Sequence, residues 1–162
     1  MKPTTRDHVV AATHLVLGPS NFVVIRLPDR WDLRLGRHPM DVDYTVVHDG
    51  VRWAQEGRAS GLLVDAQARR AIELSLRTAR GLIPPPKLDE SRPGMCKMGG
   101  HAASYALGSA HFGLLGTKLY QVLHLSYRCD ETQRLVDLRF MHRGTAELLE
   151  GLLTPLAGTR CH

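Results

Sequence analysis

The sequence predicts an α+β fold in which helices pack on an antiparallel, sandwich-like β-sheet. Short stretches of alternating apolar and polar residues, typical of half-buried strands, are joined by turn signals. Two longer stretches place apolar residues three and four positions apart, which is typical of amphipathic helices. In chain order the prediction is four strands, a helix, three strands and a final helix, and consecutive strands joined by hairpins favour an antiparallel sheet.

Four strands are expected early in the chain, at Phe22–Leu27, Trp31–Leu35, Val42–His48 and Val51–Gln55. The first is rich in β-branched and aromatic residues, which favour extended backbone. Pro28–Arg30 is the first turn, and Asp49-Gly50 is a hairpin signal because type I′ turns need positive φ at both central residues. The preceding residues 8–17 fit either a short helix or a strand, which the Gly-Pro turn at residues 18–21 is expected to end.

A helix is expected from about Leu63 to Arg80. Its apolar positions recur at three- and four-residue steps, at Val64, Ala68, Ala71, Ile72, Leu76 and Ala79. Gly81 fits the position just after a helix, and Pro84–Pro86 prevents the helix from continuing. The stretch Pro84–Gly94 is expected to be an extended, stiff connector within one domain rather than a domain boundary.

The second group of strands contains the central hairpin of the predicted sheet. Apolar residues alternate with more polar ones at Leu119, Leu123, Leu125 and Tyr127. The charged segment Asp130–Arg134 is the expected loop, and Leu135–Phe140 is the returning strand. A further strand is expected to begin near Gly99.

The last helix is expected to begin after Gly144. Thr145 is a suitable N-cap, and Glu147 lies in the first turn, where the helix dipole favours an acid. The apolar stripe of this helix consists of Leu148, Leu149, Leu152, Leu153 and Leu156. Pro155 is expected to end or kink the helix.

Length and composition predict one globular domain over residues 1–162. The hydrophobic content of 43% is ordinary for a soluble protein, and ~150 residues bury about two thirds of their unfolded surface. No stretch approaches the ~18 apolar residues of a membrane span, and the polar start lacks the apolar core of a signal peptide. We therefore expect a cytoplasmic protein. The preference for arginine over lysine is compatible with a thermophilic source.

Three features resemble the family of PsbP/Mog1-like α/β sandwich domains. They are the turn at Leu27–Trp31, the strand start at Gly99–Ala102, and the hairpin that leads into the last helix. The resemblance covers Phe22 to Leu156 and implies a small binding or accessory domain without an active site. No functional residue of the family carries over. Cys129 and the terminal Cys161-His162 lie outside the family pattern and suggest an uncharacterised, archaeal subfamily.

The three cysteines, Cys96, Cys129 and Cys161, are too far apart for a Cys-x-x-Cys metal motif. A disulfide between Cys129 and Cys161 is the favoured interpretation, and closing a loop of ~30 residues would contribute roughly 3 kcal/mol. Free thiols stay open as a second interpretation. A zinc site stays open as a third, with four ligands, His101, Cys129, Cys161 and His162.

Histidine is common in this chain, and three histidines lie around the central hairpin, at His101, His111 and His124. They are candidates for a metal or acid–base site, although surface or hydrogen-bonded histidines are the usual explanation. A nucleophilic pair of Cys129 with His101 or His162 is a weaker hypothesis. The sequence contains no Gly-x-Ser-x-Gly, His-Glu-x-x-His, phosphate-loop or dinucleotide motif.

The net charge of +5 favours contact with anions, but no run of five like charges occurs. Four arginines around the hairpin are candidates for binding an anion or a partner: Arg128, Arg134, Arg139 and Arg143. Tyr120 and Tyr127 add stacking surfaces of the kind that single-stranded nucleic acids use. Pairing of the arginines with neighbouring acids is the competing explanation.

Together these features predict a small non-catalytic binding or accessory domain whose partner is another protein. A second hypothesis is a zinc-binding protein with a Cys/His site near the C-terminus. A third is weak nucleic-acid binding through the arginine-rich hairpin. A membrane partner is not expected.

Overall fold

The computed structural model describes residues 4–14, 18–35 and 56–161. The strands are β1 (Thr5–His14), β2 (Gly18–Pro28), β3 (Asp32–Leu35), β4 (Glu56–Asp65), β5 (Arg70–Ala79), β6 (Asp89–Met98), β7 (His101–Phe112), β8 (Lys118–Cys129) and β9 (Arg134–His142). The helices are α2 (Ala146–Glu150) and α3 (Leu153–Leu156), and a 3-10 turn, η1 (Leu114–Gly116), joins β7 to β8. Among these residues, no helix is long and apolar enough to span a membrane.

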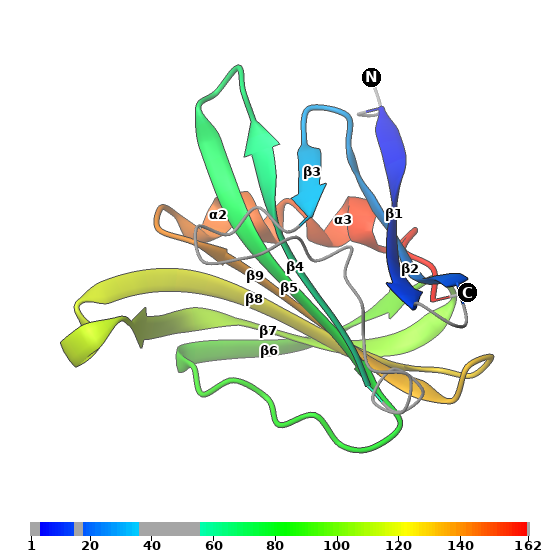
Figure 1. Cartoon of the computed structure of the whole chain (residues 1–162). Helices are drawn as coiled ribbons and strands as arrows, with labels where there is room; N and C mark the ends of the chain where they lie inside the picture. Colours follow the sequence, from blue (N-terminus) through cyan, green and yellow to red (C-terminus); the bar gives the residue numbers. More distant parts are fainter. Residues whose placement is uncertain (1–3, 15–17, 36–55, 162) are drawn as a thin grey trace.

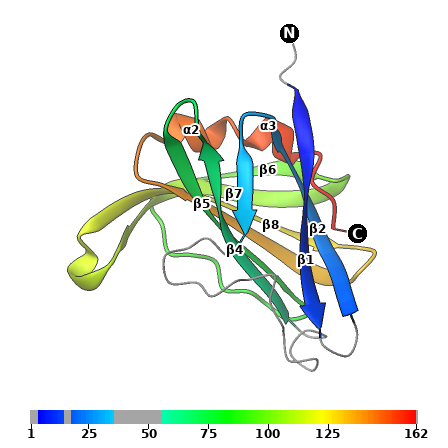
Figure 2. The same cartoon turned by 45° about the horizontal axis from the view of Figure 1, so that its top comes forward.

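The strands form two antiparallel sheets. A seven-stranded sheet has the order β3-β4-β5-β9-β8-β7-β6, and β1 and β2 form a separate hairpin. The larger sheet is strongly curved, and both helices lie along one side of it, next to the β1–β2 hairpin (Figures 1 and 2). α2 contacts β7, β8 and β9, whereas α3 contacts β2. The helices therefore connect the large sheet to the small one.

The core lies between the large sheet, the helices and the β1–β2 hairpin. From the sheet it takes alternate residues of β8 and β9, including Leu123, Leu125, Leu138 and Phe140, all fully buried. Leu149 and Leu156 come from the helices, and Ile25, Leu27 and Trp31 come from β2 and the turn that follows it. The large sheet, the helices and the β1–β2 hairpin thus each contribute apolar side chains to one core. Burial of these side chains away from water favours docking of the helices and the hairpin on the same face of the sheet.

The expected helix over Leu63–Arg80 is wrong, because this segment forms the hairpin of β4 and β5. Ile72, Leu74 and Leu76 are buried while the residues between them are less so, which is the period of a strand. Residues four apart share a face in a helix and in a strand alike, so Ile72 and Leu76 fit both patterns. A turn stabilised by the Ala68 N–H donating to Asp65 Oδ1 at 3.0 Å breaks the segment in two.

As a consequence, no helix separates the two groups of strands in the described part of the chain. Over the described residues the protein is mostly antiparallel β, and its α-helices follow the last strand, rather than the interleaved α+β order expected. β5 pairs directly with β9, so the first group of strands continues the same sheet as the central hairpin.

The remaining expectations have mixed outcomes along the chain. The strand over Phe22–Leu27 and the central hairpin are confirmed, the latter as β8 and β9. The turn expected at residues 18–21 is wrong, since these residues belong to β2 and pair with residues 11–14. Half of the expected connector is instead β6, where Pro93 is tolerated because the strand lies at the edge of the sheet. The hairpin around Asp49-Gly50 lies outside the described residues.

The expected C-terminal helix is present but interrupted. It divides into α2 and α3 at Gly151 and Leu152, so Pro155 lies within α3 instead of ending it. Thr145 is the N-cap residue of α2. The backbone N–H of Glu147 and the Thr145 hydroxyl hold the pKa of the Glu147 carboxyl below its usual range. After α3 the chain turns at Gly158 back toward β2, where Arg160 pairs with Val24.

The turn between β6 and β7 fixes the C-terminal segment. Gly99 has φ of +55°, and a Cβ on it would lie 2.4 Å from the carbonyl oxygen of Thr159. Gly100 also has positive φ, at +90°, but a Cβ there would meet open space. The Gly99 N–H also donates a hydrogen bond to Ala157 O at 2.9 Å, which holds the C-terminal segment against the turn.

Gly99→Ala should therefore destabilise the protein by more than Gly100→Ala. Both changes strain a positive φ, by about 1 kcal/mol, but only the first pushes the C-terminal backbone away, which adds about 1 to 3 kcal/mol. The difference between the two variants in urea unfolding isolates this contact. Equal stability of the two variants would show that the C-terminal segment does not pack on the turn.

Candidate functional site

The sequence-predicted cysteine and histidine residues come together beside the C-terminus. Cys129, the last residue of β8, forms a disulfide with Cys161, which lies 32 residues further along the chain. Both are buried. His101, the first residue of β7, has its Nε2 atom 3.5 Å from Cys161 Sγ, and its ring stacks on Tyr127 at 5.9 Å between centroids.

Three separate elements hold this cluster in place. The Gly99-Gly100 turn places His101 at the start of β7, and the pairing of β7 with β8 sets it near Tyr127 and Cys129. The C-terminal segment is held by backbone hydrogen bonds of 2.8 and 2.9 Å between Arg160 and Val24. Cys161 therefore reaches the end of β8 by pairing with the small hairpin, not through the disulfide alone.

Ion pairs next to the cluster also hold the C-terminal segment against the β1–β2 hairpin. Asp7 of β1 accepts hydrogen bonds from Arg26 at 2.7 Å and from Arg160 at 3.0 Å. The bond from Arg26 and the positive charges of both arginines hold the pKa of the Asp7 carboxyl below its usual range. The Asp7 carboxylate thus joins β1 to β2 and to Arg160, the residue before Cys161.

His101 also has a carboxylate partner. Its Nδ1 atom lies 3.2 Å from Asp130 Oδ2, on the turn that follows Cys129. A carboxylate on one ring nitrogen orients the other nitrogen, here Nε2, toward the sulfur atoms. The donor atoms of His101, Cys129 and Cys161 all lie within 4.8 Å of one another. The fourth expected ligand, His162, lies outside the described residues.

The remaining cysteine does not join the cluster. Cys96 lies on β6 and is the free cysteine among the described residues. Burial raises the pKa of its thiol, which is the opposite of what an activated nucleophile requires. Cys96 therefore serves as a control in experiments on Cys129 and Cys161.

The three histidines of the hairpin region lie at separate places. His111, near the far end of β7, has its Nδ1 atom 3.1 Å from the carbonyl oxygen of Gly116. His124, in the middle of β8, is buried, with its Nε2 atom 2.5 Å from Asp137 Oδ2. Neither lies beside His101, so the histidines belong to three local arrangements.

His124 and Asp137 belong to a buried polar network that sequence reasoning did not identify. The second carboxylate oxygen, Asp137 Oδ1, accepts a hydrogen bond of 2.9 Å from Arg139 Nε. Arg139 also donates to the carbonyl oxygen of Pro84 at 2.8 Å, which ties the connector after β5 to the sheet. Asp137 and Arg139 line a small cavity of about 250 Å³ with Ser60, Ser75 and Arg77.

The four candidate arginines are spread along the β8–β9 hairpin. Arg128 and Arg134 lie at its turn, on opposite faces, since Arg128 pairs with Leu135 and Arg134 pairs with Cys129. Arg139 lies in the middle of β9, and Arg143 follows the end of that strand. Arg128 donates to Gln133 O at 3.1 Å, and burial lowers the pKa of Arg134. The four guanidinium groups do not converge on one ligand.

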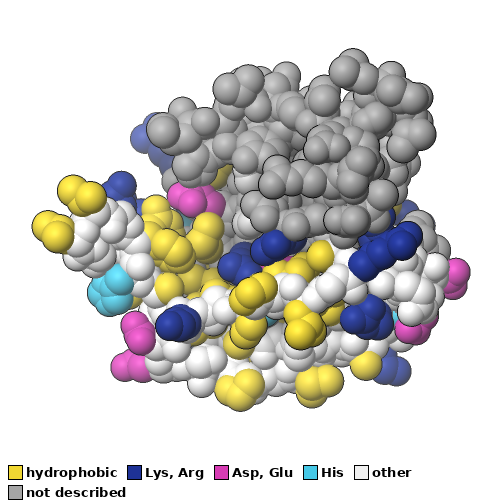
Figure 3. Space-filling view, turned by 60° about the horizontal axis from the view of Figure 1, so that its bottom comes forward, with side chains coloured by type: hydrophobic (Ala, Val, Ile, Leu, Met, Phe, Trp, Pro, Cys, Tyr) yellow, Lys and Arg dark blue, Asp and Glu magenta, His cyan; other side chains and the backbone are white. Residues whose placement is uncertain are grey.

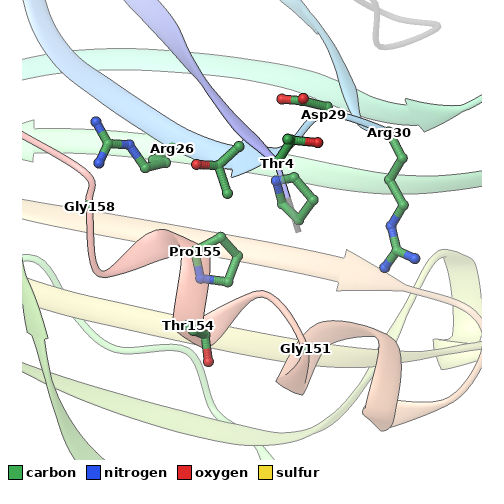
Figure 4. Close-up of a pocket in the computed structure, with 10 residues that line it drawn as sticks. Thr4, Arg26, Asp29, Arg30, Gly151, Thr154, Pro155 and Gly158 are labelled. Carbon is green, nitrogen blue, oxygen red and sulfur yellow. The ribbon is translucent and has the colours of Figure 1, made fainter. Parts of the chain in front are cut away.

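A groove of about 770 Å³ separates the β1–β2 hairpin from α2 and α3. Figure 4 shows its lining: threonine hydroxyls, proline rings and glycine backbone, with Arg26 toward one end and Arg30 toward the other. Arg26 is engaged by Asp7, whereas the Arg30 guanidinium lies over the Trp31 ring, 5.6 Å from its centroid. These contacts of the two arginines are internal to the protein.

Four of the exposed large apolar residues gather at the end of the β7–β8 hairpin. This apolar tip consists of Phe112, Leu114, Leu115 and Leu119, of which the two central leucines are 90% and 92% exposed. The hairpin projects from the body of the molecule, at the opposite end from the β1–β2 hairpin (Figures 1 and 2). Figure 3 shows hydrophobic side chains at this projecting end.

The sequence contained a signal for this tip. The run Phe112-Gly113-Leu114-Leu115-Gly116 places large apolar residues between glycines, where polar turn residues are usual. Only the hairpin geometry shows that these side chains leave the core. No family model, curated protein or solved structure matches this chain significantly, so the fold and these sites are the grounds for assigning a function.

Proposed function

We propose that this protein is a non-catalytic binding domain that contacts a partner protein through the apolar tip of the β7–β8 hairpin. The observation that carries the proposal is the near-complete exposure of Leu114 and Leu115 at the end of a projecting hairpin. Isolated exposed leucines are common, but adjacent large apolar side chains on one projection are typical of an interaction site. The partner would supply a pocket that buries them.

The tip is held in a defined shape before any partner binds. The Gly116 N–H donates to Gly113 O at 3.1 Å, and the ring of His111 lies 3.1 Å from Gly116 O. The aromatic rings of Phe112 and Tyr120 meet edge to face, with centroids 5.4 Å apart. A pre-organised tip loses little conformational entropy on binding, so more of the burial energy becomes affinity.

The backbone of the tip is itself unusual. Leu115 has φ of +65°, the left-handed region that large side chains seldom occupy. This conformation directs a second leucine outward beside Leu114. Strained backbone of this kind is found at binding and switch sites, where the side-chain direction matters for function.

A protein partner fits the tip better than a lipid surface does. Lys118 is the single Lys or Arg between residues 111 and 120, and each such charge adds only about 1 kcal/mol of attraction to an anionic membrane. A rigid pair of leucines is instead suited to a matching apolar pocket, since interface hot spots lie in well-packed, desolvated pockets.

The variants Leu114→Ser and Leu115→Ser, combined in one chain, test the proposal. Burial of each leucine contributes about 1.5 to 3 kcal/mol, so loss of both should lower the affinity for a stoichiometric partner recovered with the wild-type chain by at least about 100-fold. Leu82→Ser is the matched control, because Leu82 is also 92% exposed but lies in the connector after β5. This control should bind as the wild type does.

Two results would contradict the proposal. One is equal affinity of the tip variant and the wild type for the partner. The second is co-sedimentation with neutral or anionic vesicles that the tip variant loses, which would assign the tip to a membrane. Because the substituted leucines are exposed, unchanged thermal stability should accompany either result.

A further inference from the structure

We infer that reduction of the Cys129–Cys161 disulfide converts the cluster with His101 into a zinc site. This inference is independent of the proposed function and rests on the placement of the three donor atoms. Cys129 Sγ, Cys161 Sγ and His101 Nε2 lie within 4.8 Å of one another, on three elements held by contacts besides the disulfide. Two thiolates and one imidazole form a common zinc ligand set.

The distances suit zinc after a small adjustment. In a tetrahedral site with Zn–S bonds of about 2.3 Å and Zn–N bonds of about 2.0 Å, neighbouring donor atoms lie roughly 3.5 to 3.8 Å apart. The separation of 3.5 Å between His101 Nε2 and Cys161 Sγ already meets this requirement. Once the S–S bond is broken, the two sulfur atoms must separate by only about 2 Å, a movement that side-chain rotation provides.

The surroundings of His101 also match those of a metal ligand. The Asp130 carboxylate contacts Nδ1 of the His101 ring, so Nε2 is the ring nitrogen that faces the sulfur atoms. Carboxylate–histidine–zinc arrangements of this kind orient the ring and raise its basicity. The His101 side chain retains 12% exposure, and both cysteines are buried, so the three donor atoms lie largely away from bulk solvent. A water molecule or a further residue would complete the fourth position.

The chemistry balances with a dithiol reductant. Such a reductant transfers two electrons and two protons, becomes a disulfide itself, and leaves thiols on Cys129 and Cys161. Binding of Zn²⁺ then displaces both thiol protons, giving two protons released per metal ion. The cytoplasmic location that the sequence predicts is one where disulfides are subject to reduction. When the cysteines are oxidised, the disulfide crosslinks the C-terminal segment to the end of β8. When they are reduced, zinc would hold the same elements together.

Zinc titration of the full chain, oxidised and after reduction, tests this inference. The reduced protein should bind one Zn²⁺ in competition with a chromophoric chelator, and the oxidised protein should bind none at this site. Cys96→Ser should bind as the wild type does, whereas His101→Ala should bind at least 10-fold more weakly, and Cys129→Ser should lose the site.

Cobalt substitution gives a second readout that does not depend on the variants folding. Co²⁺ added to the reduced wild type should show thiolate-to-metal charge transfer and the intense visible bands of a tetrahedral site. Absence of these bands would overturn the inference, as would equal zinc affinity of His101→Ala and the wild type. Binding that Cys96→Ser abolishes would place the metal elsewhere and overturn it as well.

Discussion

Replacing both Cys129 and Cys161 by alanine is expected to lower the free energy of unfolding by about 3.5 to 4 kcal/mol. The disulfide closes a loop with a sequence separation of 32 residues, and in the chain-entropy model the loss of such a cross-link frees the unfolded state by about this amount. The loop contains all of β9, α2 and α3. Urea unfolding of the oxidised wild type and the double variant measures the difference.

Cys96→Ala is the matched control for this experiment. Cys96 is half-buried and unbridged, so its replacement should cost no more than about 1 kcal/mol and should not alter sensitivity to reductant. The wild type should lose stability on reduction in metal-free buffer, whereas the double variant should not. Equal unfolding midpoints for the wild type and the double variant would show that the backbone contacts of the C-terminal segment alone hold it.

The second large effect is expected at Asp137. Asp137→Asn keeps the size of the side chain but removes the charge that contacts both His124 and Arg139. Breaking a buried ion pair by removing one partner costs several kcal/mol, because the remaining charge stays away from water. Arg139 is partly exposed, so we expect about 3 kcal/mol, measured by urea unfolding at neutral pH.

Asp130→Asn provides the comparison. Asp130 also contacts a histidine, but its side chain is 82% exposed, and exposed ion pairs contribute about 0 to 1 kcal/mol. The two variants therefore make the same chemical change to a His–Asp pair at different burial. A loss at Asp130→Asn as large as that at Asp137→Asn would contradict our view that burial makes the Asp137 network important.

The sequence predicted those parts of the fold that depend on local patterns. The alternation of Leu123, Leu125 and Tyr127 identified the central strand, and the charged segment after Cys129 identified its turn. The disulfide between Cys129 and Cys161 was also predicted, and it joins the end of the central strand to the C-terminus.

The remaining parts depend on partners that a local pattern does not contain. Ile72 and Leu76 fit a helix and a strand equally, and only pairing of β5 with β9 decides in favour of the strand. The contact of His124 with Asp137 requires the register of β8 and β9, in which Ser126 is opposite Asp137. The projection of the apolar tip depends on β7 and β8 staying paired as far as Phe112 and Lys118, beyond the residues that pair with the neighbouring strands β6 and β9.

Site-specific photo-crosslinking at the apolar tip is the most direct test of the proposed function. A photoreactive side chain at position 115 should give one discrete crosslinked product with a partner protein, and the same side chain at position 82 should not. Positions 115 and 82 are equally exposed, so the comparison separates binding from accessibility. An identical crosslinking pattern from both positions, or none from position 115 while the partner stays bound, would contradict our account.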